Sequence, residues 1–293
     1  YGSPMNNMSG RTITYHHGEW HEGNPPMLGP MVHSLWMASA VFDGARAFSG
    51  LVPDLDRHCA RVVTSAQSFG MTPEFSPAEI EVLTWTGIDM FDAGAELYIR
   101  PLFYFADGFV TPDLESTSFM LTLFESPMPV WHGTKACLSS FRRPSPEMAP
   151  TTAKASCLYP NVARAMLEAR KRGFDMAVML DGFGNVAEFS TSNLFIVKNE
   201  VVRTPLANGT FLAGITRARV MELLKLNGVV VAEETLKFDD VLDADEVFLT
   251  GNYPKLLPVV RIEDRDYQEG PMSRLARDLY FSFAERDGRK KAA

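Results

Sequence analysis

The chain has 293 residues, a formal net charge of −8 and an average globular composition, with 46% hydrophobic and 22% charged residues. This length suits one large domain or two ordinary ones, and the composition excludes a disordered, collagen-like or coiled-coil chain. The longest apolar runs, such as residues 256–260, are far shorter than the roughly 20 residues of a membrane-spanning helix. The acidic charge also argues against a nucleic-acid-binding protein.

The compartment is indicated by the cysteines and the first residues. Cys59, Cys137 and Cys157 are an odd number and widely spaced, which favours a reducing environment. Residues 1–10 are small and polar and do not resemble a Sec-type leader. We therefore expect a cytoplasmic protein without a membrane partner.

Two helices are predicted in the first half of the chain. Residues 56–69 carry apolar side chains at helical spacing, with Asp56 as the expected N-cap and Gly70 as the stop. Ser76 and Pro77 begin the second helix, because serine is a good N-cap and proline suits the first helical position.

Helix and strand signals are about equally frequent over the whole chain. Strands are predicted at residues 12–16, 97–105, 118–124, 137–141, 176–180, 194–197, 229–232, 246–250 and 256–260, and further helices at 162–172 and 216–226. Pro127 and Pro129 interrupt both kinds of element, so residues 125–133 are interpreted as an interdomain linker. The sequence thus predicts an N-terminal domain at residues 1–124, a C-terminal domain at residues 134–293, and an α/β or α+β fold.

Several common site signatures are missing. There is no P-loop, and the Asp-Gly-Phe-Gly run at residues 181–184 is interpreted as a hairpin turn and not as a dinucleotide-binding motif. The six histidines show no metal-ligand spacing, so no metal site is expected, and His16 and His17 are predicted at a strand end facing solvent. No G-x-S-x-G nucleophile elbow occurs.

Two features are less ordinary. Gly214, Ile215 and Thr216 begin a predicted helix, where free amides and the helix dipole bind anions, although an ordinary cap formed by the Thr216 hydroxyl is the alternative. Lys154 lies among small, uncharged residues, which favours a neutral, nucleophilic amine, although a surface lysine is the alternative. Together these features suggest a phosphorylated aldehyde cofactor.

Six motifs follow one another between about Met31 and Val260. They are Val41-Phe42-Asp43-Gly44-Ala45-Arg46, His58-Cys59-Ala60-Arg61, Tyr98-Ile99-Arg100-Pro101, residues 143–154 with Tyr159 beyond, Ala187-Glu188 with Asn193-Leu194-Phe195, and Leu212 with Gly214-Ile215-Thr216-Arg217. This series resembles the motifs of fold type IV pyridoxal-phosphate enzymes, and within them those of the branched-chain amino acid aminotransferases.

The resemblance implies a two-domain fold type IV enzyme that moves an amino group from an L-amino acid, with branched-chain donors as the first choice, to 2-oxoglutarate. Lys154 would form a Schiff base with pyridoxal 5'-phosphate and then act as the base, while Glu188 would pair with the pyridine nitrogen. The implied cofactor-binding residues are Arg61, Lys154, Tyr159, Glu188, Leu212, Ile215, Thr216 and Asn252. The implied substrate-binding residues are Met37, Phe42, Tyr98, Arg100 and Tyr253.

Some substrate-facing positions depart from the family pattern. Met37 stands where the family has a tyrosine, and residues 251–254, Gly-Asn-Tyr-Pro, replace a small Gly-Thr-Ala-Ala turn. These changes leave alternatives open, namely an aromatic amino acid or amine transaminase, an aminodeoxychorismate-type lyase, and a non-catalytic binder of pyridoxal phosphate. The expected partners are small-molecule amino acids and 2-oxo acids, and the resemblance also implies a homodimer.

Overall fold

The computed structural model describes residues 10–289 and divides into two compact units. Unit 1 comprises the chain up to Met128, the segment Ala153–Cys157 and the residues from Ala284 onward. Unit 2 comprises Pro129–Thr152 and Leu158–Phe283. Within the described residues, no helix has both the length and the apolar character that a membrane span requires. The domain boundaries expected around residues 125–133 stay a prediction, and the segment with Lys154 groups with unit 1.

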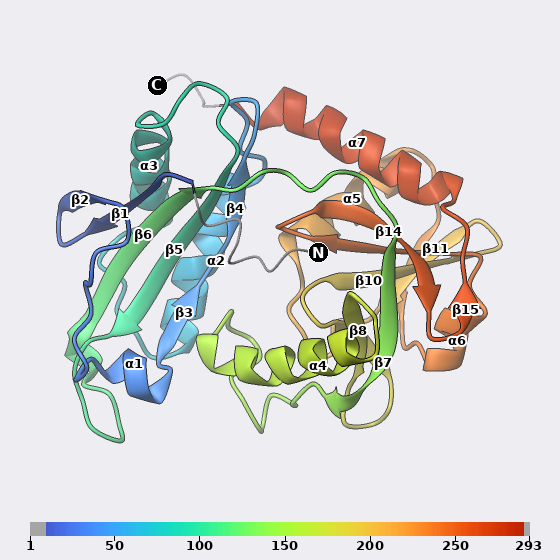
Figure 1. The fold of residues 1–293 in the computed structure, drawn as a ribbon, viewed down its shortest axis with the longest axis horizontal. Helices are drawn as coiled ribbons and strands as arrows, with labels where there is room; N and C mark the ends of the chain where they lie inside the picture. The colour runs from blue at the N-terminus through green and yellow to red at the C-terminus, as the bar shows by residue number, and fades with distance from the viewer. Residues whose placement is uncertain (1–9, 290–293) are drawn as a thin grey trace. The chain divides into compact units, whose positions relative to one another are not determined.

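Unit 1 is built on one antiparallel sheet (Figure 1). Its strands are ordered β2-β1-β6-β5-β3, and β4 also pairs with β5. The strands are β1 (Thr12–His16), β2 (Glu19–Glu22), β3 (Ala40–Phe42), β4 (Ala45–Ala47), β5 (Leu97–Phe105) and β6 (Thr117–Glu125). Helices α2 (Leu55–Ser68) and α3 (Pro77–Ile88) pack against each other and against this sheet, and a short helix α1 (His33–Met37) precedes β3.

Buried and partly exposed side chains alternate along the first part of β5, and the exposed ones are available for a site. Leu97, Ile99 and Phe103 are fully buried, whereas Tyr98 and Arg100, between them, are only partly covered. Successive side chains of a strand point to opposite faces of the sheet. The face of β5 that does not enter the core therefore carries Tyr98 and Arg100.

The helix boundaries of unit 1 test the predicted caps. The Ser76 hydroxyl accepts from the Glu79 amide and the Glu79 carboxylate accepts from the Ser76 amide, which confirms Ser76 as the N-cap of α3. Gly70 follows α2 with a φ of +82°, which glycine adopts without strain, as predicted for the stop. The prediction of Asp56 as N-cap is wrong, because α2 begins earlier and Asp54 occupies that position.

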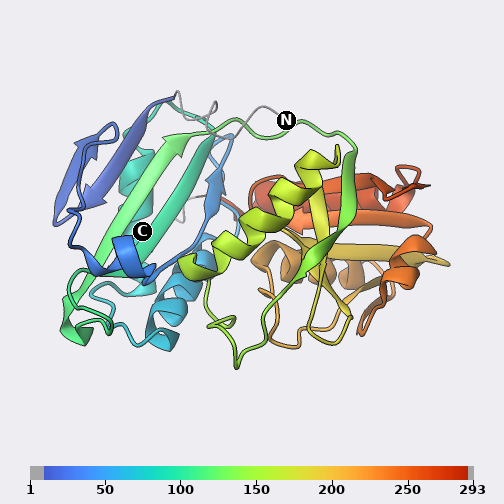
Figure 2. The same ribbon diagram turned by 60° about the horizontal axis from the view of Figure 1, so that its bottom comes forward.

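Unit 2 contains a nine-stranded mixed sheet in the order β12-β11-β10-β13-β14-β7-β8-β9, with β15 beside β14. The strands are β7 (Thr134–Arg142), β8 (Met176–Leu180), β9 (Val186–Phe189), β10 (Asn193–Lys198), β11 (Val201–Pro205), β12 (Val231–Glu234), β13 (Glu246–Gly251), β14 (Lys255–Ile262) and β15 (Arg265–Asp266). Its helices are α4 (Tyr159–Lys171), α5 (Ile215–Leu226), α6 (Phe238–Leu242) and α7 (Pro271–Asp287), and Figure 2 shows α4 alongside β7 and β8. Helices and sheets in both units confirm the predicted α/β or α+β class.

The central strands of unit 2 are buried on both faces. In β10, Leu194 and Ile196 belong to one apolar cluster, while Phe195 belongs to a second cluster with residues of α5 and α7. Phe195 stacks on Phe248 of β13, with 4.9 Å between the ring centroids. A strand packed on both faces needs a continuous apolar run, which explains the Leu-Phe-Ile-Val sequence of β10.

Two local predictions have clear outcomes. The turn at residues 181–184 is the predicted hairpin, since the Asp181 amide donates to the Asn185 carbonyl between β8 and β9. The prediction that His16 faces solvent is wrong, because His16 is buried with its Nε2 2.7 Å from the hydroxyl of Tyr104.

The first two residues of the charged run at residues 286–291 complete α7. Lys290 and Lys291 lie outside the described residues. The other end of α7 is capped from a distance, since the Glu246 carboxylate of β13 accepts from the amides of Met272 and Ser273 at 3.2 Å each. This cap was not recognisable locally, and α7 was missed.

Candidate active site

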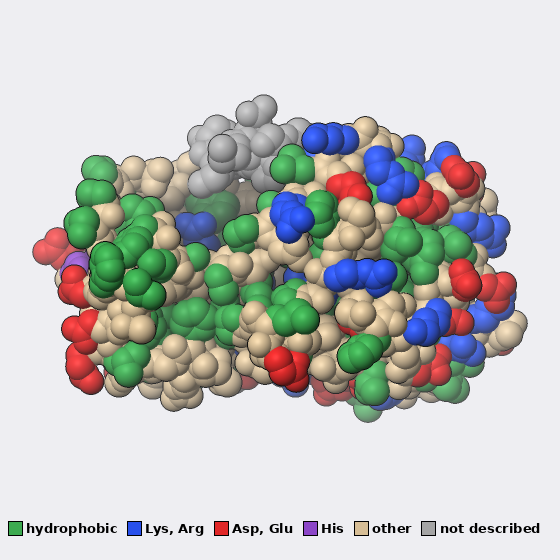
Figure 3. Space-filling model, turned by 90° about the horizontal axis from the view of Figure 1, so that it is seen from below, with side chains coloured by type: hydrophobic (Ala, Val, Ile, Leu, Met, Phe, Trp, Pro, Cys, Tyr) green, Lys and Arg blue, Asp and Glu red, His purple; other side chains and the backbone are tan. Residues whose placement is uncertain are grey.

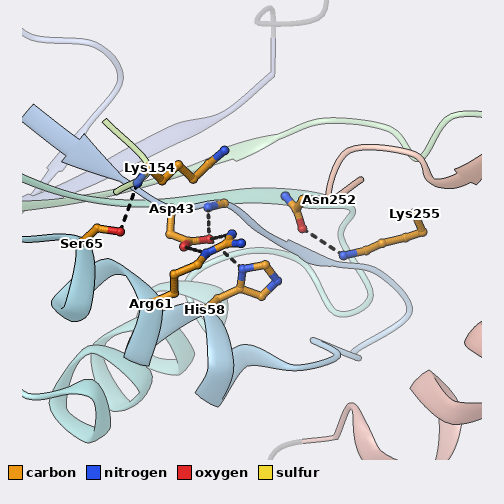
Figure 4. A network of polar contacts seen from close by, with 8 residues as sticks. Asp43, His58, Arg61, Ser65, Lys154, Asn252 and Lys255 are labelled. Atoms are coloured by element: carbon orange, nitrogen blue, oxygen red, sulfur yellow. Dashed lines mark hydrogen bonds and ion pairs between the residues drawn. The ribbon is translucent and has the colours of Figure 1, made fainter. Parts of the chain in front are cut away.

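Lys154 is held in unit 1 by its backbone. Its amide donates to the Ser65 hydroxyl of α2 at 3.2 Å, and its carbonyl accepts from the Phe42 amide at 3.0 Å (Figure 4). The small residues on either side, Ala153 and Ala155, are buried, and the Lys154 side chain is partly covered with Nζ 4.9 Å from the centre of the Phe42 ring. The backbone is thus fixed while the amine extends beside an aromatic ring.

A buried carboxylate orients Arg61. Asp43, fully buried, accepts from Arg61 Nε at 2.6 Å and from Nη2 at 2.8 Å, and its Oδ1 lies 2.7 Å from His58 Nδ1 (Figure 4). Burial alone would raise the pKa of Asp43, but the Arg61 guanidinium and His58 together lower it well below its ordinary value. Because an ionised carboxylate only accepts, His58 Nδ1 carries the proton in this contact. The two contacts with Asp43 thus fix the plane of the Arg61 guanidinium, which extends from α2.

Arg100 is a cation in an apolar strand. Burial lowers its pKa, and its Nε has no hydrogen-bond partner among residues 10–289. Tyr98 lies two positions earlier on the same face of β5. A buried guanidinium nitrogen without an acceptor is suited to bind an anionic ligand.

Two further predicted substrate-binding residues of unit 1 differ in exposure. Phe42 at the end of β3 is partly buried, and Met37 at the end of α1 is exposed.

In unit 2, Asn193 connects three of the predicted site residues. Its Nδ2 donates to the Leu212 carbonyl at 2.9 Å and lies 3.4 Å from Glu188 Oε2. A Cβ added at Gly214 would lie only 2.1 Å from Asn193 Oδ1, so a side chain at this position would displace the Asn193 amide. The folding of β10 therefore brings Glu188, Leu212 and the start of α5 together around one amide.

Glu188 has a second partner, Arg143. The Arg143 Nε lies 3.2 Å from Glu188 Oε1 and also donates to the Thr210 carbonyl at 3.1 Å. Both side chains are less than 10% exposed. A buried carboxylate held by an arginine and an asparagine keeps one orientation.

The start of α5 is an open helix N-terminus. Gly214 is the N-cap and contributes no side chain, and no side-chain cap hydrogen bond is formed. The alternative, in which the Thr216 hydroxyl caps this helix, is wrong, because Gly214 is the N-cap and Thr216 lies within the first turn. Amides at such an end, together with the positive end of the helix dipole, favour an anion.

The turn after β13 holds the remaining predicted residues. Asn252, Tyr253 and Pro254 are partly buried, and Lys255 at the start of β14 is fully buried. Lys255 Nζ lies 2.9 Å from Asn252 Oδ1 (Figure 4). Tyr159, the last of the predicted set, is the first residue of α4.

Each unit thus brings together part of the predicted set. Unit 1 places Lys154 on a strand-like segment bonded to Phe42 and fixes Arg61 in α2, while unit 2 gathers Glu188 and Leu212 around Asn193. The sequence missed the roles of four residues, namely Asp43, Arg143, Asn193 and Lys255. Asp43, Arg143 and Asn193 already stood in the motifs, so an unassigned polar residue within a motif was the available signal.

Two broader observations bear on the type of site. Among the described residues, no group of three or more His, Cys, Asp or Glu side chains is placed to hold a metal ion. On the face drawn in Figure 3, Lys and Arg side chains are interspersed with Asp and Glu side chains and form no continuous basic area.

Comparison with known proteins supplies the family. A family model described as amino-transferase class IV matches residues 40–262. A "Probable branched-chain-amino-acid aminotransferase" of Aquifex aeolicus is 33% identical over 266 residues, which is 86% of each chain. An aminotransferase from Brucella abortus, solved with the cofactor PLP, is 45% identical with a TM-score of 0.92 and covers 94% of this chain and 99% of its own. The T.th. branched-chain amino acid aminotransferase, complexed with N-(5'-phosphopyridoxyl)-L-glutamate, is 29% identical with a TM-score of 0.84 and covers 94% of both chains.

Proposed function

Because the chain belongs to the class IV aminotransferase family, we propose that it uses pyridoxal 5'-phosphate to transfer the amino group of a branched-chain L-amino acid to 2-oxoglutarate. The observation that carries this proposal is the cluster around Asn193. It combines the buried Glu188 carboxylate with an open helix N-terminus at Gly214. A ligand with a basic ring nitrogen and a phosphate requires both kinds of partner.

When bound, pyridoxal phosphate supplies an aldehyde that condenses with amines and a pyridinium ring that accepts the electron pair left at the substrate Cα. Glu188 accepts the ring N–H and keeps that nitrogen protonated, while Arg143 and Asn193 hold the carboxylate in place. The amides of Ile215 and Thr216 donate to the phosphate. Tyr159 donates to the phenolic oxygen of the ring, and Leu212 packs against its face.

Lys154 is proposed as the catalytic base. Its Nζ would hold the cofactor in the resting enzyme, and, once the amino group of the substrate has displaced it, the free amine would move a proton between the substrate Cα and the cofactor. The two backbone hydrogen bonds at Lys154 limit the movement of this amine to its side-chain torsions. Arg61, fixed by Asp43, adds a cationic contact to the phosphate, worth about 1.5–3 kcal/mol as a charge-assisted hydrogen bond.

The substrates are proposed from β5 and the turn after β13. Arg100 binds a carboxylate of the dicarboxylic acceptor, because this cation is largely buried and its Nε has no partner among the described residues. The T.th. relative, complexed with a phosphopyridoxyl-glutamate, supports a dicarboxylic co-substrate. Tyr98, Phe42, Met37 and Tyr253 are proposed to shape the pocket for the amino donor, and Asn252 to contact the cofactor.

A homodimer located in the cytoplasm completes the proposal. The homodimer is supported by the resemblance of the motifs to those of the branched-chain amino acid aminotransferases. Sedimentation of the purified chain with its cofactor tests the assembly. A monomer at all concentrations would contradict it.

The reaction is tested with a panel of amino donors. The protein loaded with pyridoxal phosphate is mixed with L-leucine, L-phenylalanine or 1-phenylethylamine, and the absorbance change to the pyridoxamine form is followed. Leucine should give the fastest change and should form glutamate when 2-oxoglutarate is added. A faster change with phenylalanine or with the amine would move the assignment to an aromatic or amine transaminase, and no change with any donor would favour a non-catalytic binder.

A further inference from the structure

The turn between β13 and β14 contains a charged residue that the proposed mechanism does not use. Lys255 is fully buried and has a positive φ of 62°. A positive φ is uncommon for a residue with a side chain, and a buried ammonium loses its hydration. Residues that combine such costs cluster at functional sites.

Lys255 determines which way the Asn252 side chain faces. Its Nζ lies 2.9 Å from Asn252 Oδ1. An ammonium group has three donors and no acceptor, so only the carbonyl oxygen of the amide can face it. The Asn252 amide nitrogen is thereby turned away from the lysine.

That amide nitrogen is a donor without an acceptor. Asn252 Nδ2 is buried and has no hydrogen-bond partner within residues 10–289. The same holds for the hydroxyl oxygen of Thr250, a fully buried residue at the end of β13. Buried polar groups in native proteins are nearly always satisfied, so two such groups near one turn indicate that a ligand completes them.

We propose that Lys255 is a positioning residue that holds Asn252 so that Nδ2 donates to an anionic oxygen of the ligand. The inference rests on the proposed function, in which Asn252 contacts the cofactor. The phosphate of the cofactor and the carboxylate of the substrate offer the same kind of acceptor.

Two variants separate positioning from a merely structural role. Asn252→Asp keeps an acceptor for Lys255 and strengthens that contact, but it removes the Nδ2 donor. Lys255→Met keeps the length of the side chain and removes its charge. Lys237→Met is the matched control, because Lys237 also donates to an asparagine oxygen, Asn185 Oδ1 at 2.6 Å, but lies exposed elsewhere in unit 2.

The two sources of the anionic oxygen are distinguished by matched ligands. The dissociation constants of pyridoxal phosphate and of pyridoxal for the full chain freed of cofactor report on the phosphate. The half-saturating concentrations of L-leucine and of isoamylamine, its analogue without the carboxylate, report on the substrate in the loaded protein. Melting temperature is measured for every variant.

Asn252→Asp and Lys255→Met should each lower the affinity for one anionic ligand about tenfold or more. The affinity for the matched ligand that lacks the anionic group should stay unchanged, and the Lys237→Met control should bind all ligands as the wild type does. An effect on pyridoxal phosphate identifies the phosphate, and an effect on leucine identifies the carboxylate. In an Asn252→Ala background, Lys255→Met should cause no further loss, because Lys255 acts through Asn252.

Wild-type affinities in Asn252→Asp for both anionic ligands would overturn the inference, even if Lys255→Met lowered the melting temperature or failed to fold. A wild-type chain that takes up no pyridoxal phosphate would instead contradict the proposed function. In that case two simple anions still decide the inference. They are inorganic phosphate, titrated by ³¹P NMR, and 4-methylvalerate, titrated by calorimetry, each against wild type and Asn252→Asp. Equal binding of both anions by the two proteins would overturn it.

Discussion

Glu188 and Arg143 form a buried ion pair in unit 2, with 3.2 Å between Oε1 and Nε. Asn193 approaches the other carboxylate oxygen, so both oxygens of Glu188 have a protein partner and the side chain has one orientation. A carboxylate fixed in this way is suited to hold a protonated ring nitrogen without reorganisation during the reaction.

Glu188→Gln should therefore lower turnover by about 10²- to 10³-fold, the range seen when a preorganised electrostatic contact is removed. The glutamine keeps the shape but no longer holds the ring nitrogen protonated. Single-turnover conversion by L-leucine measures the effect. Glu233→Gln is the matched control, because Glu233 also pairs with an arginine of unit 2, Arg217. Equal turnover in the two variants would remove Glu188 from the mechanism.

Asp43→Asn should destabilise the protein by about 3 kcal/mol at neutral pH, because it leaves the partly buried Arg61 without its carboxylate. The pH dependence has a definite sign. The folded pKa of Asp43 is below its ordinary value, so its contribution is complete above the unfolded pKa of about 3.9 and is lost as the pH falls below it.

The free energy of unfolding, measured by urea titration between pH 7 and 2, tests this behaviour. The difference between wild type and Asp43→Asn should be largest at neutral pH and should shrink in acid. Glu22→Gln removes the carboxylate of an exposed ion pair with Arg11 and should cause no measurable loss at any pH. A difference that grows on acidification would show that the sign is wrong.

Arg100→Met should separate acceptor binding from stability. We expect kcat/KM for 2-oxoglutarate to fall about 10- to 100-fold, because charge-assisted hydrogen bonds to the acceptor are lost. The reaction with 4-methyl-2-oxopentanoate, which has no second carboxylate, should change little. The melting temperature should stay the same or rise, because a largely buried cation is replaced by an apolar side chain. An equal loss with both acceptors would contradict the role of Arg100.

The fold could be predicted where the signals are local. Helix α3 was identified because its N-cap Ser76 and its first helical residue Pro77 are adjacent in the sequence, and β5 because apolar and aromatic residues dominate residues 97–105. Helix α7 was not identified, because its N-terminal cap is Glu246 of β13. Contacts between distant segments leave no local pattern.

The same distinction holds for the candidate site. The motifs indicated which residue types to examine, including Lys154 and Glu188, and their roles stay predictions. The partnership of Asp43 with Arg61 joins residues of different elements and became visible only in three dimensions. The burial of Lys255 was also hidden, because a lysine after Tyr253-Pro254 has the sequence of an exposed turn.

The central claim is that the amine of Lys154 bonds the cofactor aldehyde. Borohydride reduction of the protein loaded with pyridoxal phosphate makes that bond permanent, and mass spectrometry of a proteolytic digest then locates the added group. The account predicts one phosphopyridoxyl group on the peptide that contains Lys154 and none on Lys255, the fully buried lysine of unit 2. A group found on Lys255 or on another lysine, or no modification in a protein that retains the cofactor, would contradict the account.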